Sequence, residues 1–391
     1  MDWLAFPAAF LAAFLVSWGV NSLALTPWRQ AAGLHWTERA RRLSTARTSR
    51  SFNVMFLPFT FAILGAMVWD NDGYIAFVLG VFGLLGAMLG NYPFLVETTA
   101  PISLGSWIRQ FPALWVLHYG FATFVLCVAA IMPKHIGWDV LVIGLAVLGV
   151  HAWLNFGLAV TLMRGLGVLV PAPDRLAHIV SETSMRMGIE VRRVWLLHNV
   201  YGYAAALPST RELIFSDRLL AASPDSEVAS ICVHELGHLS EDRTVMRQRN
   251  LLSLGWYPLI FIKPALALPD PWRGLAVLAS LLILLLTGRN SRKLGRQMEV
   301  RADAIAAGNT SDPAIYARAL ERLHEINLVP AVMRTEKLTH PHLYDRMLAA
   351  GVTPSYDRPA PPDGRHWTRG IVPTIFGVVL GIFLSLLIRN S

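Results

Sequence analysis

Long stretches of apolar residues recur along this chain and are separated by short polar connections. A helix needs about 20 apolar residues to cross the hydrocarbon core of a bilayer, and several stretches approach or reach that length. These stretches are residues 4–25, 53–69, 74–91, 113–132, 139–162, 251–268, 272–288 and 370–388. The stretch at 251–268 is the weakest, because Lys263 and Pro264 interrupt it. The pattern predicts a polytopic α-helical membrane protein of about eight spans.

Two polar regions, residues 164–250 and 289–369, have the patterns of a folded domain instead. In the first, Asp174 opens an amphipathic helix that Gly188 ends. Three β-type segments follow it, at residues 194–197, 203–207 and 213–215. The second region begins with a predicted helix over residues 289–308. Together the two regions are long enough for one α+β domain, which a hairpin of two spans divides in the sequence.

Composition strengthens the membrane interpretation. Hydrophobic residues make up 54% of the 391 residues and charged residues only 15%, with a mean hydropathy of +0.45. Soluble globular chains are usually about 25% charged. The first apolar stretch has no basic residue before it and no small-residue cleavage site. We therefore expect it to be a retained span and not a signal peptide.

The net charge of +8 is explained by the rule that basic residues concentrate on the cytoplasmic side of a membrane protein. We place the arginine-rich residues 26–50 in the cytoplasm, and each successive span then crosses the membrane in the opposite direction. Both polar regions then also fall in the cytoplasm, and both termini fall outside. Of the 34 Lys and Arg, the exceptions to a cytoplasmic position are Lys134, Lys263, Arg273 and Arg389. No nucleic-acid-reading motif accompanies the charge, so nucleic-acid binding is excluded, and the bilayer is the expected partner.

The segment His234-Glu235-Leu236-Gly237-His238 has the HExxH spacing of zinc-dependent peptidases. Ser223-Pro224-Asp225 signals the start of a helix before it. Two histidines four residues apart on a helix project from one face and can bind one metal ion, while the glutamate between them can act as a general base. The alternative, an ordinary surface helix that carries two histidines, is disfavoured by the signal for a helix start and by the apolar face of the helix at Val228, Ile231, Cys232 and Leu239.

A catalytic zinc site needs a third protein ligand and an open position for water. Glu299 is the best candidate, because it lies in a predicted helix directly after the span hairpin. Asp303 lies one helical turn further on and can hydrogen-bond a ligating histidine, which fixes the tautomer of that histidine. We therefore expect one Zn²⁺ per chain, held by His234, His238 and Glu299.

At these motifs the chain resembles the integral-membrane zinc metalloendopeptidases typified by HtpX and the type I CAAX prenyl protease. The matching segments are His234-Glu235-Leu236-Gly237-His238, Glu299-Val300-Arg301-Ala302-Asp303, and Thr339-His340-Pro341-His342 followed by Arg346. The resemblance is specific over about residues 165–350, and the remaining spans match only in general layout. It implies a zincin-like metalloprotease domain, and the final span at 370–388 is an addition to the seven-span plan of the CAAX proteases.

The resemblance also implies roles for individual residues. It makes Glu235 the general base and His340 the residue that helps to stabilise the tetrahedral intermediate, with His342 as the competing candidate for that role. It makes Arg346 an organiser of the site. An edge strand that includes Tyr203, Ala204 and Ala205 is expected to hold the substrate backbone. Where the family has an asparagine before this strand, the chain has Tyr201.

The leading hypothesis is a zinc endopeptidase that cleaves membrane-associated, misfolded or lipidated proteins at the cytoplasmic face. Two alternatives remain open: a signal-transducing membrane protease that cleaves one regulator, and a membrane scaffold with a vestigial zinc site. The predicted outer loops are short, which argues against an external ligand-binding domain. The presence of His234, Glu235, His238 and Glu299 argues against a vestigial site.

The predicted organisation has six parts. They are a five-span membrane region (1–163), a catalytic segment with the HExxH helix (164–250), a transmembrane hairpin (251–288), a catalytic segment with the third zinc ligand (289–351), a proline-rich linker (352–369) and a C-terminal span (370–391).

Overall fold

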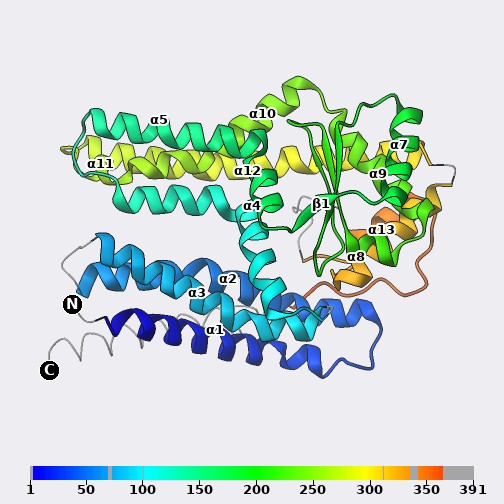
Figure 1. Cartoon of the computed structure of the whole chain (residues 1–391), viewed down its shortest axis with the longest axis horizontal. Helices are drawn as coiled ribbons and strands as arrows, with labels where there is room; N and C mark the ends of the chain where they lie inside the picture. The colour runs from blue at the N-terminus through cyan, green and yellow to red at the C-terminus, as the bar shows by residue number, and fades with distance from the viewer. Residues whose placement is uncertain (1–2, 69–72, 100, 311, 335–341, 364–391) are drawn as a thin grey trace. The chain divides into compact units, whose positions relative to one another are not determined.

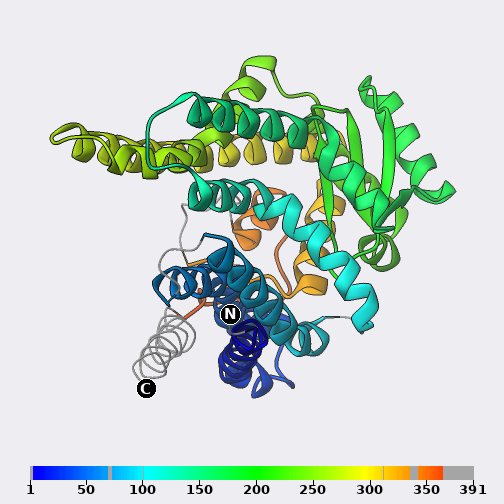
Figure 2. The same cartoon turned by 60° about the vertical axis from the view of Figure 1, so that its left-hand side comes forward.

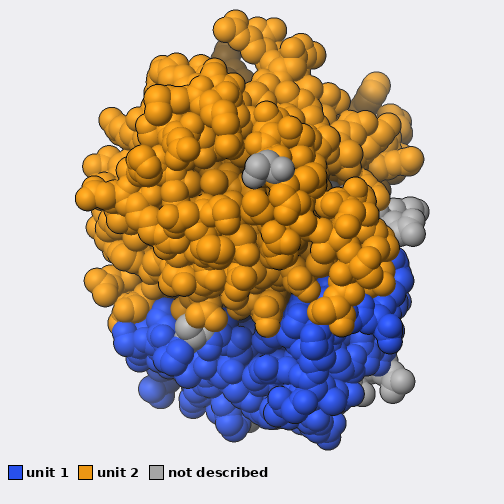
Figure 3. Space-filling model, turned by 90° about the vertical axis from the view of Figure 1, so that its right-hand side faces the viewer, with its two compact units in different colours: residues 1–104, 327–334, 356–391 blue, residues 105–326, 335–355 orange. Residues whose placement is uncertain are grey.

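The computed structural model describes residues 3–68, 73–99, 101–310, 312–334 and 342–363. The chain divides into two compact units, which Figure 3 distinguishes by colour. Unit 1 comprises residues 1–104, 327–334 and 356–391, and unit 2 comprises residues 105–326 and 335–355. The predicted span at 370–388 and the candidate residue His340 lie outside the described residues.

Within the described residues, three helices are long and apolar enough to cross a membrane. They are α1 (Ala5–Arg29), the segment Tyr74–Thr98 of α3 (Gly73–Thr98), and α12 (Trp272–Gly308). The shorter helix α5 (Trp138–Trp153) is also apolar. These helices support the prediction of a membrane protein. They are fewer than the predicted number of about eight spans.

Unit 1 is built on α1, α2 (Trp36–Val68) and α3. Helices α1 and α3 approach closely because small residues lie between them: a Cβ atom added to Gly90 would lie 2.6 Å from the Phe14 carbonyl oxygen. A buried polar network joins the same two helices. Asn21 donates to the Asn91 side chain at 2.7 Å, and Asn91 donates to the Ser17 hydroxyl at 3.0 Å. These hydrogen bonds satisfy polar groups that would otherwise be costly to bury.

Unit 2 contains the remaining helices and a four-stranded sheet (Figure 1). The strands are β1 (Leu169–Pro171), β2 (Arg193–Leu197), β3 (Ala204–Leu207) and β4 (Glu212–Ser216). They lie in the order β1-β2-β4-β3; β2 and β4 are parallel, and β1 and β3 are antiparallel to their neighbours. The other helices of this unit are α4 (Leu104–Ile131), α6 (Ala159–Gly165), α7 (Asp174–Met187), α8 (Asp217–Ala222), α9 (Asp225–Leu239), α10 (Arg243–Ser253), α11 (Ile262–Leu266), α13 (Pro313–Asn327) and α14 (Leu343–Ala349).

The core of the polar domain lies between the sheet and helices α7, α9 and α13. Strand β4 is buried along its whole length and contributes Leu213 and Phe215 to this core. Helix α9 contributes Val228, Ile231 and Leu236. On the opposite face of the sheet, a second cluster of buried residues packs helix α6 against the strands. The sheet is therefore covered on both faces, which holds α9 in a fixed position against it.

The structure places the three predicted β-type segments in β2, β3 and β4, and Gly188 ends α7 with a φ of +65°. It differs at 251–268, where no single long helix forms. Helix α10 ends at Ser253, a 3-10 helix η2 (Leu254–Phe261) follows, and the short α11 comes next. Pro258 and Pro264 each remove a backbone donor from this segment, which prevents one continuous α-helix. The apolar residues of η2 instead pack with α4 and α5.

Helix α12 is continuous for 37 residues. The predicted boundary between the hairpin and the second catalytic segment, residues 288/289, falls inside it. Figures 1 and 2 show the helix running alongside α5 and α11 and onward to α9. One helix therefore carries both an apolar stretch long enough for a membrane and the Glu299 side chain.

Candidate metal centre

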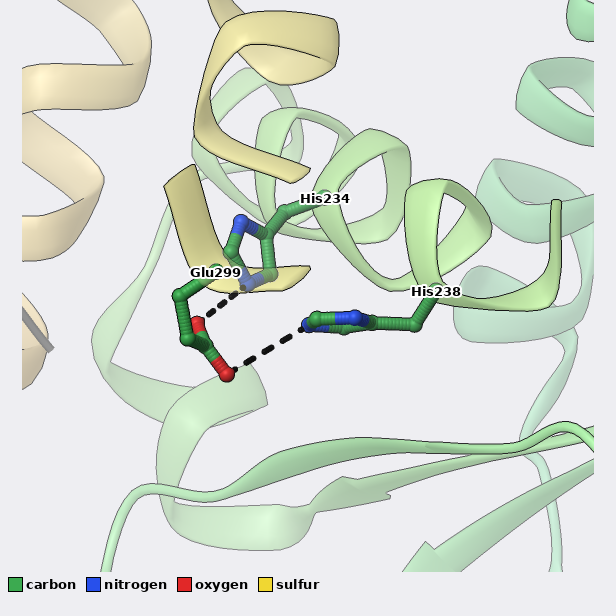
Figure 4. Close-up of side chains that lie close together, drawn as sticks. All are labelled: His234, His238 and Glu299. Atoms are coloured by element: carbon green, nitrogen blue, oxygen red, sulfur yellow. Dashed lines mark ion pairs between the residues drawn. The ribbon is translucent and has the colours of Figure 1, made fainter. Parts of the chain in front are cut away.

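Two histidines of α9 face the same side of the helix one turn apart. Figure 4 shows His234 and His238 pointing from this helix toward Glu299, which comes from α12. The ring centroids of the two histidines are 4.9 Å apart. Only 11% of the His234 side chain and 13% of the His238 side chain is exposed, so the apolar core beneath α9 holds both rings in place.

Close packing of α9 against α12 brings Glu299 to the histidines. A Cβ atom added to Gly237 would lie 3.3 Å from the Cα atom of Ala302, so the glycine lets the two helix backbones approach. The guanidinium of Arg301 donates to the carbonyl oxygens of Gly237 and Ser240 at 3.2 and 3.1 Å. These bonds give additional partners to carbonyl groups at the carboxyl-terminal end of α9. They fasten the end of the histidine helix to α12.

The donor atoms of His234, His238 and Glu299 all lie within 4.8 Å of one another. The carboxylate oxygens of Glu299 are 3.4 Å from His234 Nε2 and 3.6 Å from His238 Nε2, as the dashed lines in Figure 4 mark. Ligands bound about 2.0–2.1 Å from a tetrahedral ion lie roughly 3.4 Å from each other. Two imidazole nitrogens and one carboxylate at these spacings therefore fit a zinc ion of the catalytic type.

A second layer of polar groups supports His234. Its Nδ1 atom is 3.2 Å from Asp303 Oδ1 and 2.7 Å from the Tyr316 hydroxyl oxygen. The Tyr316 hydroxyl donates to Asp303 at 2.7 Å. Arg346 donates to the Asp303 carboxylate and, at 3.1 Å, to the Tyr316 oxygen. The structure thus places Asp303 and Arg346 beside the histidine, where they can fix the orientation of its ring.

Sequence reasoning missed Tyr316 and Arg301. Tyr316 lies on the buried face of α13, whose amphipathic pattern could have marked it as inward-facing. Nothing in the pattern distinguished it from an ordinary core aromatic. Arg301 lies between Glu299 and Asp303 in the sequence, and the motif assigns no separate role to its guanidinium.

Burial and neighbouring polar groups shift the pKa values of His234 and Tyr316, which keeps the hydrogen bonds of this cluster in one pattern. Burial lowers the pKa of His234, but hydrogen bonds with Asp303 and Glu299 raise it by more, to about 9 from an ordinary 6.5. Burial raises the pKa of the Tyr316 hydroxyl well above its ordinary value, and Asp303 adds to this rise. Tyr316 therefore keeps its proton at neutral pH and can donate it to Asp303.

Glu235 lies on α9 between the histidines and is buried. Helix α9 contacts strand β3, which Tyr203 directly precedes. Burial and the charge of Glu235 raise the pKa of the Tyr203 hydroxyl to about 12. The start of β3 is therefore close to this carboxylate.

Strand β3 contains Ala204 and Ala205, and Tyr203 directly precedes it. It is last in the strand order, so among the described residues one of its edges pairs with no strand. The other edge is fixed by β4, and the Tyr203 amide donates to the Ser216 hydroxyl at 2.8 Å. Ala204 and Ala205 are half-buried. Whether this edge binds substrate remains a prediction.

The segment that contains His340 is outside the described residues. His342, its competing candidate, is buried and directly precedes α14. Arg346 follows one turn into that helix.

An α+β domain in which a helix with paired histidines meets a carboxylate on a second helix is the arrangement of a metallopeptidase. The comparisons agree with this class. The model of peptidase family M48 matches residues 174–351, from the start of α7 to just beyond α14, so this part of the chain is similar to the metallopeptidases of family M48.

A curated relative is similar to part of the chain. It is a protein named "Protease HtpX homolog" from Acidiphilium cryptum (strain JF-5), which is 28% identical over 162 residues. The alignment covers 39% of this chain and 56% of the relative, so the chain spans about half the length of the relative it matches. These matches, together with the apolar helices, show that the chain resembles membrane metalloproteases of the HtpX type.

Proposed function

We propose that this chain is a zinc-dependent endopeptidase embedded in a membrane. It hydrolyses peptide bonds of membrane-associated, misfolded or lipidated proteins at the cytoplasmic face. The observation that carries the proposal is the convergence of two imidazole nitrogens and one carboxylate from α9 and α12 to within 4.8 Å. The printed name of the relative, a protease HtpX homolog, supports the membrane setting.

In this proposal His234, His238 and Glu299 hold one zinc ion per chain. The ion supplies Lewis-acid polarisation of the scissile carbonyl and activation of water at neutral pH. Glu235 takes a proton from that water and delivers it to the leaving amine. Asp303 and Arg346, with Tyr316, hold the His234 ring in the orientation that ligation requires.

The substrate is held in extended form by the free edge of β3, near Tyr203 to Ala205, through backbone hydrogen bonds. His340 donates a hydrogen bond to the oxyanion, an interaction that is typically worth about 3–4 kcal/mol in such sites. The distribution of Lys and Arg supports a catalytic domain on the cytoplasmic side of the membrane. In this arrangement the chain has about eight spans, and both termini lie outside.

The test is the Glu235→Gln variant of the full chain in detergent. The variant should retain one zinc per chain and lose at least about a hundredfold in peptidase rate, because the ligands remain while the general base is lost. Glu182→Gln, which changes an exposed glutamate on α7, is the matched control and should keep full activity.

Two results would contradict the proposal. Full peptidase activity in Glu235→Gln would remove the general base from the mechanism. Purified wild-type protein that takes up no zinc would favour a vestigial site in a membrane scaffold.

A further inference from the structure

A cavity of about 630 Å³ opens in unit 2 beside the metal centre. Its volume is in the range of about 300–1,000 Å³ that is typical of ligand sites. The walls come from α5, the segment that follows it, α6, the end of β3, α10, η2 and α12. None of the residues that we assign to zinc binding or proton transfer lines it.

Two elements run from the metal centre directly into this cavity. Strand β3 begins next to Glu235, and its last residues, Ala206 and Leu207, line the cavity. Helix α12 carries Glu299 at the metal centre and also lines the cavity, at Arg292 about two turns earlier and at Leu284 about four turns earlier. A chain that follows the free edge of β3 past Leu207 therefore enters the cavity.

The lining combines apolar walls with a basic edge. Met163, Trp256 and Leu284 supply apolar surface. Arg249 and Arg292 also line the cavity and are exposed, so their guanidinium groups border solvent. Such a site suits an apolar segment that carries an acidic group at one end.

The backbone at the cavity departs from regular helix. Residues Leu154–Leu158 form a kink between α5 and α6, where Gly157 has a φ of +119°, a conformation that favours glycine. His151, one turn earlier, has its Nε2 atom 3.1 Å from the Asn155 amide nitrogen and 3.0 Å from the Ser253 hydroxyl oxygen. Among the described residues its buried Nδ1 atom has no hydrogen-bond partner, so it can bond a polar atom of a bound chain.

We propose that this cavity binds an apolar segment of the substrate on the amino-terminal side of the scissile bond. The inference rests on the proposed function, since it needs a substrate strand on β3. Antiparallel pairing is the more stable kind per residue. A substrate strand antiparallel to β3 has its amino-terminal half beside Leu207, and hence its preceding residues in the cavity. An acidic residue at the end of the segment nearer the scissile bond pairs with Arg249 and Arg292, because Arg292 is closer than Leu284 to Glu299 along α12.

The experiment compares peptides built on one sequence that the zinc-loaded full chain cleaves. The first has four Leu and Phe residues followed by Glu on the amino-terminal side of the scissile bond. The second has Ser and Asn residues followed by Gln at the same positions, and the third has the apolar residues on the carboxyl-terminal side. We expect the KM for the first peptide to be at least about tenfold below those of the other two.

Two variants of α12 connect this preference to the cavity. Leu284 lines the cavity, whereas the next residue, Leu285, is 69% exposed and does not. Leu284→Trp fills the cavity and should raise the KM for the first peptide to that for the second. Leu285→Trp is the matched control and should preserve the preference. Zinc content measures folding of both variants, and Arg292→Gln should remove the advantage of Glu over Gln in the peptides.

Equal KM values for the first and second peptides in the wild type would overturn the inference and leave the proposed function intact. A preference for the third peptide would also overturn it. So would a Leu284→Trp variant that slows all three peptides by the same factor, the result expected if the cavity holds a structural lipid. Failure of the zinc-loaded protein to cleave any peptide would instead contradict the proposed function.

Discussion

At the residue scale, the His234 ring is oriented by a network and not by a single partner. Its Nδ1 atom faces both Asp303 and Tyr316, and Arg346 bonds both of those residues. Arg346 neutralises the buried carboxylate and leaves the tyrosine hydroxyl as a neutral donor. The arrangement gives the other nitrogen of the ring, Nε2, one fixed direction toward Glu299.

Removing one hydroxyl tests this network. Tyr316→Phe keeps the ring that stacks near His234 and deletes its hydrogen bonds to His234 and Asp303. Loss of such supporting partners typically costs about 10–100-fold in metal affinity or activity. We expect zinc affinity, measured by competition with a chelator, to fall by about tenfold. An unchanged affinity and an unchanged rate would show that Asp303 alone orients the ring.

The sequence was most informative at this scale. The HExxH spacing identified His234, Glu235 and His238, because the period of a helix fixes which side chains share a face. Glu299 and Asp303 could be proposed from their spacing and position after a span, and the structure brings both to His234. Tyr316 could not be found, because its role depends on how α13 packs on α9. The roles of Tyr203, Ala204, Ala205 and His340 remain predictions.

At the element scale, the contact between α9 and α12 determines whether the three donors meet. Gly237→Leu should force the two helices apart at Ala302, because no space remains for a side chain there. Overpacking of this kind costs typically about 1–3 kcal/mol. We expect zinc affinity to fall by at least about tenfold, measured by chelator competition. Gly308→Leu, at the end of α12 where a Cβ atom would meet nothing within 4 Å, is the control. If both variants bind zinc like the wild type, the close approach is not required.

A second prediction at this scale concerns α1 and α3 in unit 1. Gly90→Leu places a side chain where the Phe14 carbonyl now lies, so it should destabilise the packing of these helices by about 1–3 kcal/mol. The thermal unfolding midpoint in detergent measures this loss. Gly19→Leu on α1 meets no atom within 4 Å at its Cβ position and should leave the midpoint unchanged. Equal midpoints for all three proteins would contradict the prediction.

Element boundaries were harder to predict than the elements themselves. Apolar periodicity marks a stretch but does not say whether prolines break it, and residues 251–268 form three short pieces as a result. Apolar periodicity also does not indicate that α12 is one continuous helix, because its apolar and polar halves look like separate segments in the sequence. Strand β1 has only three residues, too few to show alternation.

At the scale of the whole molecule, the charge distribution predicts which surfaces face the cytoplasm. Lys134 lies in a predicted outer loop, and Glu182 lies on α7 in the predicted cytoplasmic domain; both are exposed. In intact cells, Lys134→Cys should react with a membrane-impermeant maleimide and Glu182→Cys should react only after permeabilisation, each compared with the unsubstituted protein. The reverse pattern would place the metal centre on the other side of the membrane.

The unbroken course of α12 has one further consequence. With its apolar stretch ending at residue 288 at the lipid surface, Glu299 stands roughly 16 Å further along the same rod, at 1.5 Å per residue. Because Arg301 and the Gly237 contact tie α9 to this rod, the histidines share that height. The protein would then select peptide bonds by their distance from the bilayer surface as well as by the residues that flank them.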